Sequence, residues 1–274
     1  MMQDRKALQA GTSHFLGQNF SKAQEIMFQS ESGDREYAWT TSWGVSTRLV
    51  GALIMTHSDD DGFVLPPKLA PAQIVILPIY KNDEQRGPVL EYVESLRKEL
   101  CAQRYNDVPL RVEVDDRDIR GGEKKWGHVK RGVPIRIEVG PKDMDKNSVF
   151  VGRRDQPKSS GMGRDEFVAN ASSILAEMQQ GLFDRALKLR KDNTVDIDNE
   201  ADFRAFFTPK NAETPEIHGG FANCYFADED SIDALLKELK VTIRCLPRDN
   251  NETPGTCFAT GKPAEKKAVF AKAY

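Results

Sequence analysis

Residues 39–48 have the sequence WTTSWGVSTR, from Trp39 to Arg48, and the apolar run LVGALIM (Leu49–Met55) follows directly. Hydroxyl groups, two tryptophans and one arginine are therefore crowded against a segment that we expect to form a buried helix over residues 45–57. A ligand site is expected at the polar end, because the apolar end would hold it in place. An arginine fork binds phosphate groups with two hydrogen bonds, although a surface arginine beside a capped helix is the ordinary alternative.

The composition excludes several classes of protein. The chain has 274 residues, of which 39% are hydrophobic and 30% are charged, and its net charge is −3. This length predicts two or three domains. No apolar run reaches the roughly 18–20 residues of a membrane helix, and the first residues lack the apolar segment of a signal peptide. We therefore expect a soluble cytoplasmic protein, in which binding of a polyanion would require a local basic patch.

Prolines and hydrophobic spacing divide the chain. Three prolines within residues 65–71 predict a semi-rigid linker, and residues 1–64 before it are few for an independent domain. Strands and helices alternate over residues 72–165, which indicates an α/β domain with a mixed sheet. The strands are expected over residues 73–80, 110–114, 134–139 and 148–154, the helices over residues 89–104 and 122–131, and a loop over residues 156–163.

The C-terminal part is expected to be smaller. Residues 166–199 predict bridging helices, with a break or kink at Gly181. Residues 200–274 predict a small α+β domain, in which the helix over residues 231–240 begins at Ser231 or Asp230 as its cap. The other elements are a helix over residues 200–207, strands over residues 219–227, 241–246, 256–259 and 269–272, and a polar loop over residues 248–254.

A locally basic segment stands out in this nearly neutral chain. Between Arg117 and Arg136 there are seven lysines or arginines and two acidic residues. Trp126 and His128 lie among them and could stack on bases. Ligands of α/β sheets bind at the carboxyl ends of the strands, and Arg117 and Lys142 each follow such an end. A solvated helix face is the alternative, but the local excess of positive charge favours a polyanionic partner.

The sequence gives little support for other kinds of catalytic or metal site. The sequence contains no G-x-S-x-G, no H-E-x-x-H and no phosphate-binding Walker loop, which argues against a self-contained hydrolase or P-loop enzyme. None of the four cysteines forms a C-x-x-C pair, so they are expected to be reduced and small buried side chains. His14 is a modest candidate, since a single histidine is more often a packed or surface residue.

Several motifs resemble the prolyl-tRNA synthetase family of the archaeal- and eukaryote-like type, over essentially the whole chain. Those similar to its late catalytic core are Gln9–His14, Leu16–Phe20 and Thr41–Arg48. Those similar to its anticodon-binding domain and the entry to it are Leu65–Pro67, Ala70–Val75, Asp115–Asp118, Gly132–Arg136 and Gly140–Asp143, and Phe270–Tyr274 is similar to its terminal tail. The resemblance implies a multidomain α/β and α+β protein, with part of the class II antiparallel catalytic sheet, a mixed-sheet anticodon-binding domain and a small α+β C-terminal domain.

The resemblance also implies roles for particular residues. Arg48 corresponds to the arginine of class II motif 3, which binds the ATP phosphates and is catalytic. The implied ATP-binding set is Gln9, Ser46, Thr47 and Arg48. The implied proline-binding set is Thr12, His14, Ser42 and Trp43. The implied anticodon-binding set is Arg117, Lys124 and Lys142, of which Lys124 matches less securely because the chain is one residue shorter there.

The family's motifs 1 and 2 have no counterpart in this sequence. Motif 2 carries a second arginine for the ATP phosphates, and motif 1 is a dimer element. The implied activity is ligation of proline to tRNA-Pro with ATP and Mg²⁺ in a homodimeric full-length enzyme, and we expect the chain alone to be inactive as a C-terminal fragment. The alternatives are a non-catalytic tRNA-binding module derived from a synthetase, and a structural interaction domain that binds no RNA.

The family's C-terminal domain often binds zinc through four cysteines. With the register fixed on Thr242–Cys245, the four ligand positions fall on Phe226, Ser231, Cys257 and Thr260. One thiolate cannot supply the four ligands of a tetrahedral zinc site. We therefore expect no structural zinc.

Overall fold

The computed structural model describes residues 1–211, 213, 216–228, 230–248 and 254–274. The chain divides into two compact units, one made of residues 1–53 and 195–274 and the other of residues 54–194. None of the described helices is long and apolar enough to cross a membrane. Most of the polar loop expected over residues 248–254 lies outside the described residues.

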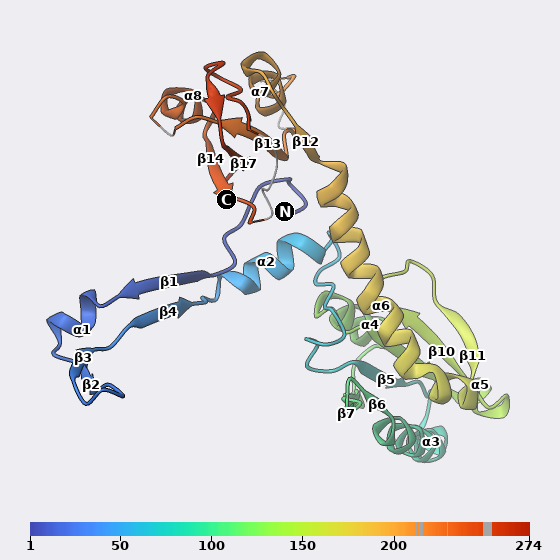
Figure 1. Cartoon of the computed structure of the whole chain (residues 1–274). Coiled ribbons are helices and arrows are strands. Elements are labelled where there is room, and N and C mark those ends of the chain that lie inside the picture. Colours follow the sequence, from blue (N-terminus) through green and yellow to red (C-terminus); the bar gives the residue numbers. More distant parts are fainter. Residues whose placement is uncertain (212, 214–215, 229, 249–253) are drawn as a thin grey trace. The chain divides into compact units, whose positions relative to one another are not determined.

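The unit of residues 54–194 is built on a five-stranded mixed sheet (Figure 1). β5 (Ile74–Pro78) lies between β8 (Val112–Val114) and β9 (Ile135–Val139) and is parallel to both. β10 (Ser148–Arg153) and β11 (Ser160–Gly163) extend the sheet beyond β9 in antiparallel orientation. The predicted α/β domain with a mixed sheet is therefore confirmed.

Helices cover both faces of this sheet unequally. α3 (Asp83–Ala102) and α6 (Arg164–Asp192) pack on the face that carries Ile76 and Ile137, and this apolar core is fully buried. Because successive side chains of a strand alternate, Val75 and Leu77 face the other side, where α4 (Gly121–Lys130) contacts β5. Shorter elements complete the unit: α5 (Pro141–Asp145) after β9, and the hairpin of β6 (Arg104–Tyr105) and β7 (Val108–Pro109).

In the other unit, an antiparallel ribbon of β1 (Thr12–Gly17) and β4 (Thr40–Gly44) precedes α2 (Arg48–His57) (Figure 1). α1 (Asn19–Ala23) and the hairpin of β2 (Met27–Gln29) and β3 (Arg35–Tyr37) lie between these two strands in sequence. Several large apolar side chains of this segment are exposed, Trp43 at 79% and Phe15 at 73%. The ribbon thus presents apolar surface as well as polar groups.

Residues 195–274 form most of a second, four-stranded sheet in the order β12-β13-β17-β14. Its strands are β12 (Thr194–Asp196), β13 (Phe221–Phe226), β17 (Lys266–Lys272) and β14 (Val241–Cys245); the helices are α7 (Glu200–Phe207) and α8 (Asp233–Leu239), and β15 (Gly255–Thr256) pairs with β16 (Pro263–Ala264). Aromatic rings fill the core: the centroid of Phe203 lies 4.4 Å from that of Phe258 and 5.6 Å from that of Phe270.

Several predicted elements need correction. α2 begins at Arg48 rather than at residue 45, because β4 continues to Gly44 in pairing with β1, and α2 contains no buried residue. The loop expected over residues 156–163 contains β11, which pairs with β10. α6 runs through Gly181 as one helix of 29 residues. α8 begins only at Asp233, since the Ser231 hydroxyl donates to the carbonyl of Asp228 instead of capping the helix.

Candidate functional site

A polar pocket of about 350 Å³ lies beside the β1–β4 ribbon. The antiparallel register places Thr12 opposite Gly44 and His14 opposite Ser42, so these positions share one face of the ribbon. The segment before β1 and the start of α2 complete the walls. The lining residues are Gln9, Ala10, Gly11, Thr12, His14, Ser42, Gly44, Val45, Ser46 and Arg48.

Gln9 connects the two ends of this pocket. Its Nε2 donates to Thr12 Oγ1 at 2.9 Å, and its Oε1 accepts from Arg48 Nη1 at 3.5 Å. The backbone N–H of Arg48 donates to Ser46 Oγ at 3.3 Å, at the start of α2. Arg48 is exposed, and its long contact to Gln9 leaves most of its donors open to an anion in the pocket.

The pocket brings together six of the eight residues expected to bind ATP or proline. Trp43 is not among its lining residues, because it pairs with Ser13 on the other face of the ribbon. Thr47 is exposed and does not line the pocket, and its carbonyl accepts from the N–H of Val50 at 3.0 Å. The roles of all eight residues stay predictions.

A second candidate site lies at the carboxyl edge of the five-stranded sheet. β8, β5 and β9 are parallel, so the segments that follow them meet at one edge. The N–H of Ile79, after β5, donates to the carbonyl of Val139 at 2.8 Å, and the N–H of Asp115, after β8, donates to that of Ile76 at 3.0 Å. These bonds hold the strand ends close together.

Asp115 and Arg117 form the most strongly paired contact at this edge. Arg117 Nε and Nη2 donate to Asp115 Oδ1 and Oδ2, each at 2.7 Å, and His128 Nε2 lies 2.8 Å from Oδ2. Asp115 and His128 are buried, whereas the side chain of Arg117 is 61% exposed. The hydrogen bond from Arg117, followed by that from His128, holds the pKa of Asp115 well below its usual range against the opposing effect of burial.

The segments after β5 and β9 line a cavity of about 540 Å³ at the same edge. Lys142 lies in its wall and is exposed. Nearby, Asp116 accepts from Tyr80 Oη at 2.9 Å and from Arg86 Nη2 at 2.8 Å. Sequence reasoning did not select Tyr80 or Arg86, and only the position of Tyr80 at a strand end could have indicated it.

Lys124 has a different environment from the other two predicted anticodon-binding residues. It lies on α4 and is only 4% exposed, whereas Arg117 and Lys142 are exposed. Its role stays a prediction, and a ligand would have to reach a buried ammonium group.

The four positions that were matched to zinc ligands differ in residue type and in burial. Phe226 and Cys257 are buried, and Ser231 is exposed. Burial opposes ionisation of the Cys257 thiol, but hydrogen bonds from the Thr260 side chain and from neighbouring backbone groups outweigh it and lower the pKa of Cys257. Among the residues that the structure describes, no three His, Cys, Asp or Glu side chains are grouped as metal ligands.

Two family models match parts of the chain. A family model described as anticodon binding domain matches residues 73–174, and one described as prolyl-tRNA synthetase, C-terminal, matches residues 213–274. The chain is 69% identical over 274 residues to a proline–tRNA ligase of Rhodopirellula baltica and 55% identical over 276 residues to one of Bdellovibrio bacteriovorus. Each alignment covers 100% of this chain and 54% of the relative, so the chain spans about half the length of these curated relatives. The chain therefore corresponds in sequence, over its whole length, to the C-terminal region of proline–tRNA ligases.

Proposed function

We propose that this chain provides the anticodon-recognising part and one wall of the aminoacylation site of a proline–tRNA ligase. In this proposal residues 72–165 bind the anticodon of tRNA-Pro, residues 1–64 belong to the catalytic domain, and residues 200–274 are the C-terminal domain without zinc. The activity is supported by the similarity to proline–tRNA ligases, and the RNA partner by the match to the anticodon-binding domain.

The contact between Asp115 and Arg117 carries the RNA-binding part of the proposal. An arginine held by two hydrogen bonds on one side presents its remaining donors to solvent in a fixed direction, which suits bidentate binding to a base edge or a phosphate. Lys142 lies at the same sheet edge as a second exposed cation. In this proposal the tRNA first contacts these exposed cations, and the buried Lys124 is not required for that contact.

The pocket beside the ribbon supports the nucleotide part. Arg48 would bind ATP phosphates, with Gln9 and Ser46 beside it, and Thr12, His14 and Ser42 would face proline. Thr47 and Trp43 do not line this pocket, and a role for them would require a different arrangement in the full-length enzyme. ATP with Mg²⁺ would supply the activated phosphate when bound in the full-length enzyme. The exposed Arg48 and its polar neighbours fit an anionic ligand, since within the described part of the chain its guanidinium contacts only Gln9, at 3.5 Å.

We further propose that a polypeptide of these 274 residues does not activate proline. Adenylate formation needs charges oriented around the triphosphate from more than one side, and the pocket offers one arginine on an open ribbon. Proline-dependent exchange of pyrophosphate into ATP should therefore be absent for the purified chain. Exchange above the level of an R48Q variant would contradict this.

A tRNA-binding module without catalysis is the second candidate. This candidate is supported by the apolar core of residues 54–194, because the residues of that core all belong to this unit. Both candidates predict salt-dependent binding of tRNA-Pro, weakened by R117Q or K142Q but not by K98Q, which removes a charge from the exposed face of α3. Equal binding by all three variants would contradict both. Complementation of a proline–tRNA ligase deficiency by the gene would favour the enzyme.

A further inference from the structure

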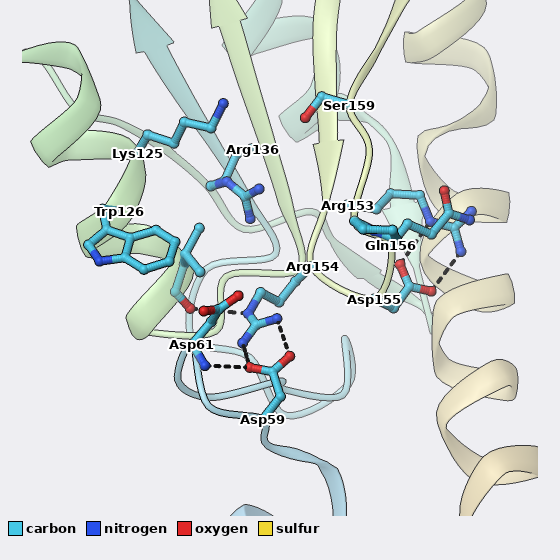
Figure 2. Close-up of a pocket in the computed structure, with 12 residues that line it drawn as sticks. Asp59, Asp61, Lys125, Trp126, Arg136, Arg153, Arg154, Asp155, Gln156 and Ser159 are labelled. Carbon is cyan, nitrogen blue, oxygen red and sulfur yellow. Dashed lines mark hydrogen bonds and ion pairs between the residues drawn. The ribbon is translucent and has the colours of Figure 1, made fainter.

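A separate cavity of about 360 Å³ lies in the unit of residues 54–194, away from the carboxyl edge of the sheet (Figure 2). It is formed over the first half of β9, beside α4 and the segment that follows β10. Four cationic side chains line it: Lys125, Arg136, Arg153 and Arg154. Trp126 and Ser159 are also in its wall, as Figure 2 shows.

Three of these four cations have carboxylate partners. Lys125 pairs with Glu138 at 3.0 Å, and Arg153 pairs with Asp155 at 2.8 Å. Arg154 donates to both carboxylate oxygens of Asp59 and also to the carbonyls of Val129 and Gly62. Of the three acidic residues in the cavity wall, Asp59 and Asp155 are thus engaged by arginines, and Asp61 is the third.

Arg136 is the exception. It is 8% exposed, the same fraction as Arg154, yet its Nε and Nη1 are buried and have no hydrogen-bond partner among the residues that the structure describes. Figure 2 shows its guanidinium in the space between α4 and Ser159, with no dashed contact. Burial, and then the nearby charge of Arg154, lower the pKa of Arg136 against the opposing effect of the Glu138 carboxylate. A buried, unpaired guanidinium is unfavourable unless an anion neutralises it.

The sheet register explains how Arg136 is accommodated. Arg136 lies opposite Gly152 in the β9–β10 pair. A Cβ at position 152 would come within 3.1 Å of Arg136 Nη2 and 2.8 Å of Ser159 Oγ. The glycine therefore leaves room for the guanidinium and the hydroxyl to lie on either side of the same small space, where both can donate to one acceptor.

We propose that this cavity is a binding site for a phosphate group, held by the guanidinium of Arg136 and the hydroxyl of Ser159. The planar fork of arginine matches phosphate oxygens. Trp126, 47% exposed at the rim, offers a surface on which an attached base can stack. The phosphate comes either from the backbone of a bound tRNA or from a free phosphorylated molecule, and only the tRNA source rests on the function proposed above.

Thermal unfolding of the full chain tests the site directly. In a phosphate-free buffer, addition of inorganic phosphate at about tenfold excess over its Kd should raise Tm by about 2–4 °C relative to chloride at equal ionic strength. The K98Q control should show the same rise and R136Q should show none. A rise in R136Q equal to that of the wild type, or no rise in the wild type, overturns the proposal. An equal rise with acetate overturns the assignment to phosphate.

A second variant covers the case in which R136Q fails to fold. S159D places a carboxylate beside the guanidinium, at a position that is only half-buried. It should raise Tm in chloride and remove the response to phosphate, because the carboxylate occupies the place of the anion. A full phosphate response in S159D overturns the proposal.

Equilibrium binding of tRNA-Pro identifies the source of the phosphate. If it is the tRNA backbone, R136Q binds more weakly than K98Q and the slope of log K against log salt falls by about one. If tRNA affinity is unchanged while the phosphate response depends on Arg136, the source is a free phosphorylated molecule. If the wild type binds no tRNA, the function proposed above fails, and the phosphate response alone still decides for or against the cavity.

Discussion

The guanidinium of Arg117 is held against the carboxylate of Asp115 by two parallel hydrogen bonds of 2.7 Å, and Asp115 is only 6% exposed. His128 Nε2 reaches the same carboxylate from α4 at 2.8 Å. A buried anion thus fixes an exposed cation at the edge of the sheet where the parallel strands end. This pairing links the fold of residues 54–194 to the proposed recognition of RNA.

The first prediction concerns this pairing. D115N keeps the size of the side chain but removes the charge that orients Arg117. We expect tRNA-Pro affinity to fall about tenfold, as for R117Q, because each removes one well-placed arginine contact. The double variant D115N/R117Q should bind no more weakly than R117Q alone, since both changes act on one interaction. Additive losses in the binding titrations would show that Asp115 does not act through Arg117.

The second prediction concerns acid stability. The pKa of Asp115 lies below its unfolded value of about 3.9. Its contribution to the free energy of unfolding is therefore complete well above pH 3.9 and is lost as pH falls toward the pKa of the folded state. As pH falls below about 5, the unfolded chain binds progressively more protons at this position than the folded chain, up to one, which lowers stability by up to about 1.4 kcal/mol per pH unit. In urea unfolding at pH 3 to 6, the free energy of unfolding should fall less steeply with decreasing pH for D115N than for the wild type. Equal slopes for the two proteins would contradict the prediction.

Sequence periodicity predicted the mixed sheet well because its signals are local. β5 is a continuous apolar run, and the spacing of Val93, Leu96 and Leu100 follows one face of α3. The start of α2 was predicted less well, because β4 before it forms by pairing with β1, more than twenty residues away in sequence, and propensity does not encode such pairing. β11 was missed for the same reason, since its polar, glycine-rich sequence forms a strand only beside β10.

The candidate site residues were likewise only partly predictable from the sequence. Arg117 and Lys142 were predicted from their positions after strands, and the parallel pairing places both segments at one edge. The anchoring of Arg117 by Asp115 and the burial of Lys124 depend on how α4 packs against β5, which spacing does not reveal. The place of the Arg136 side chain beside Ser159 depends on its register opposite Gly152, which the sequence alone does not reveal.

The third prediction concerns the turn between α4 and β9. Gly132 has a φ of +72°, and a Cβ there would come within 2.7 Å of the Cβ and the carbonyl oxygen of Phe63. G132A should therefore lower the free energy of unfolding by about 2–4 kcal/mol, from backbone strain and from overpacking. G127A, on α4 where a Cβ has no neighbour within 4 Å, is the matched control and should be neutral or slightly stabilising. Equal urea midpoints for the two variants would contradict the prediction.

The fourth prediction concerns metal content. Of the four positions that the resemblance implies as zinc-ligand positions, the sequence has a cysteine at one, and Thr260 hydrogen-bonds its sulfur. Elemental analysis of the purified chain should find far less than one zinc per molecule, and a chelator should leave Tm unchanged. Stoichiometric zinc that is lost together with stability on chelation would contradict this.

The central claim is that the carboxyl edge of the five-stranded sheet recognises the anticodon of tRNA-Pro. The most direct measurement is equilibrium binding of the full chain to tRNA-Pro and to the same tRNA with its anticodon bases exchanged, each with the wild type and with R117Q. We expect the wild type to bind the natural anticodon at least about tenfold more tightly, and R117Q to lose most of this preference while its binding to the altered tRNA changes little. Equal affinity of the wild type for both tRNAs, or a preference that R117Q retains in full, would contradict it.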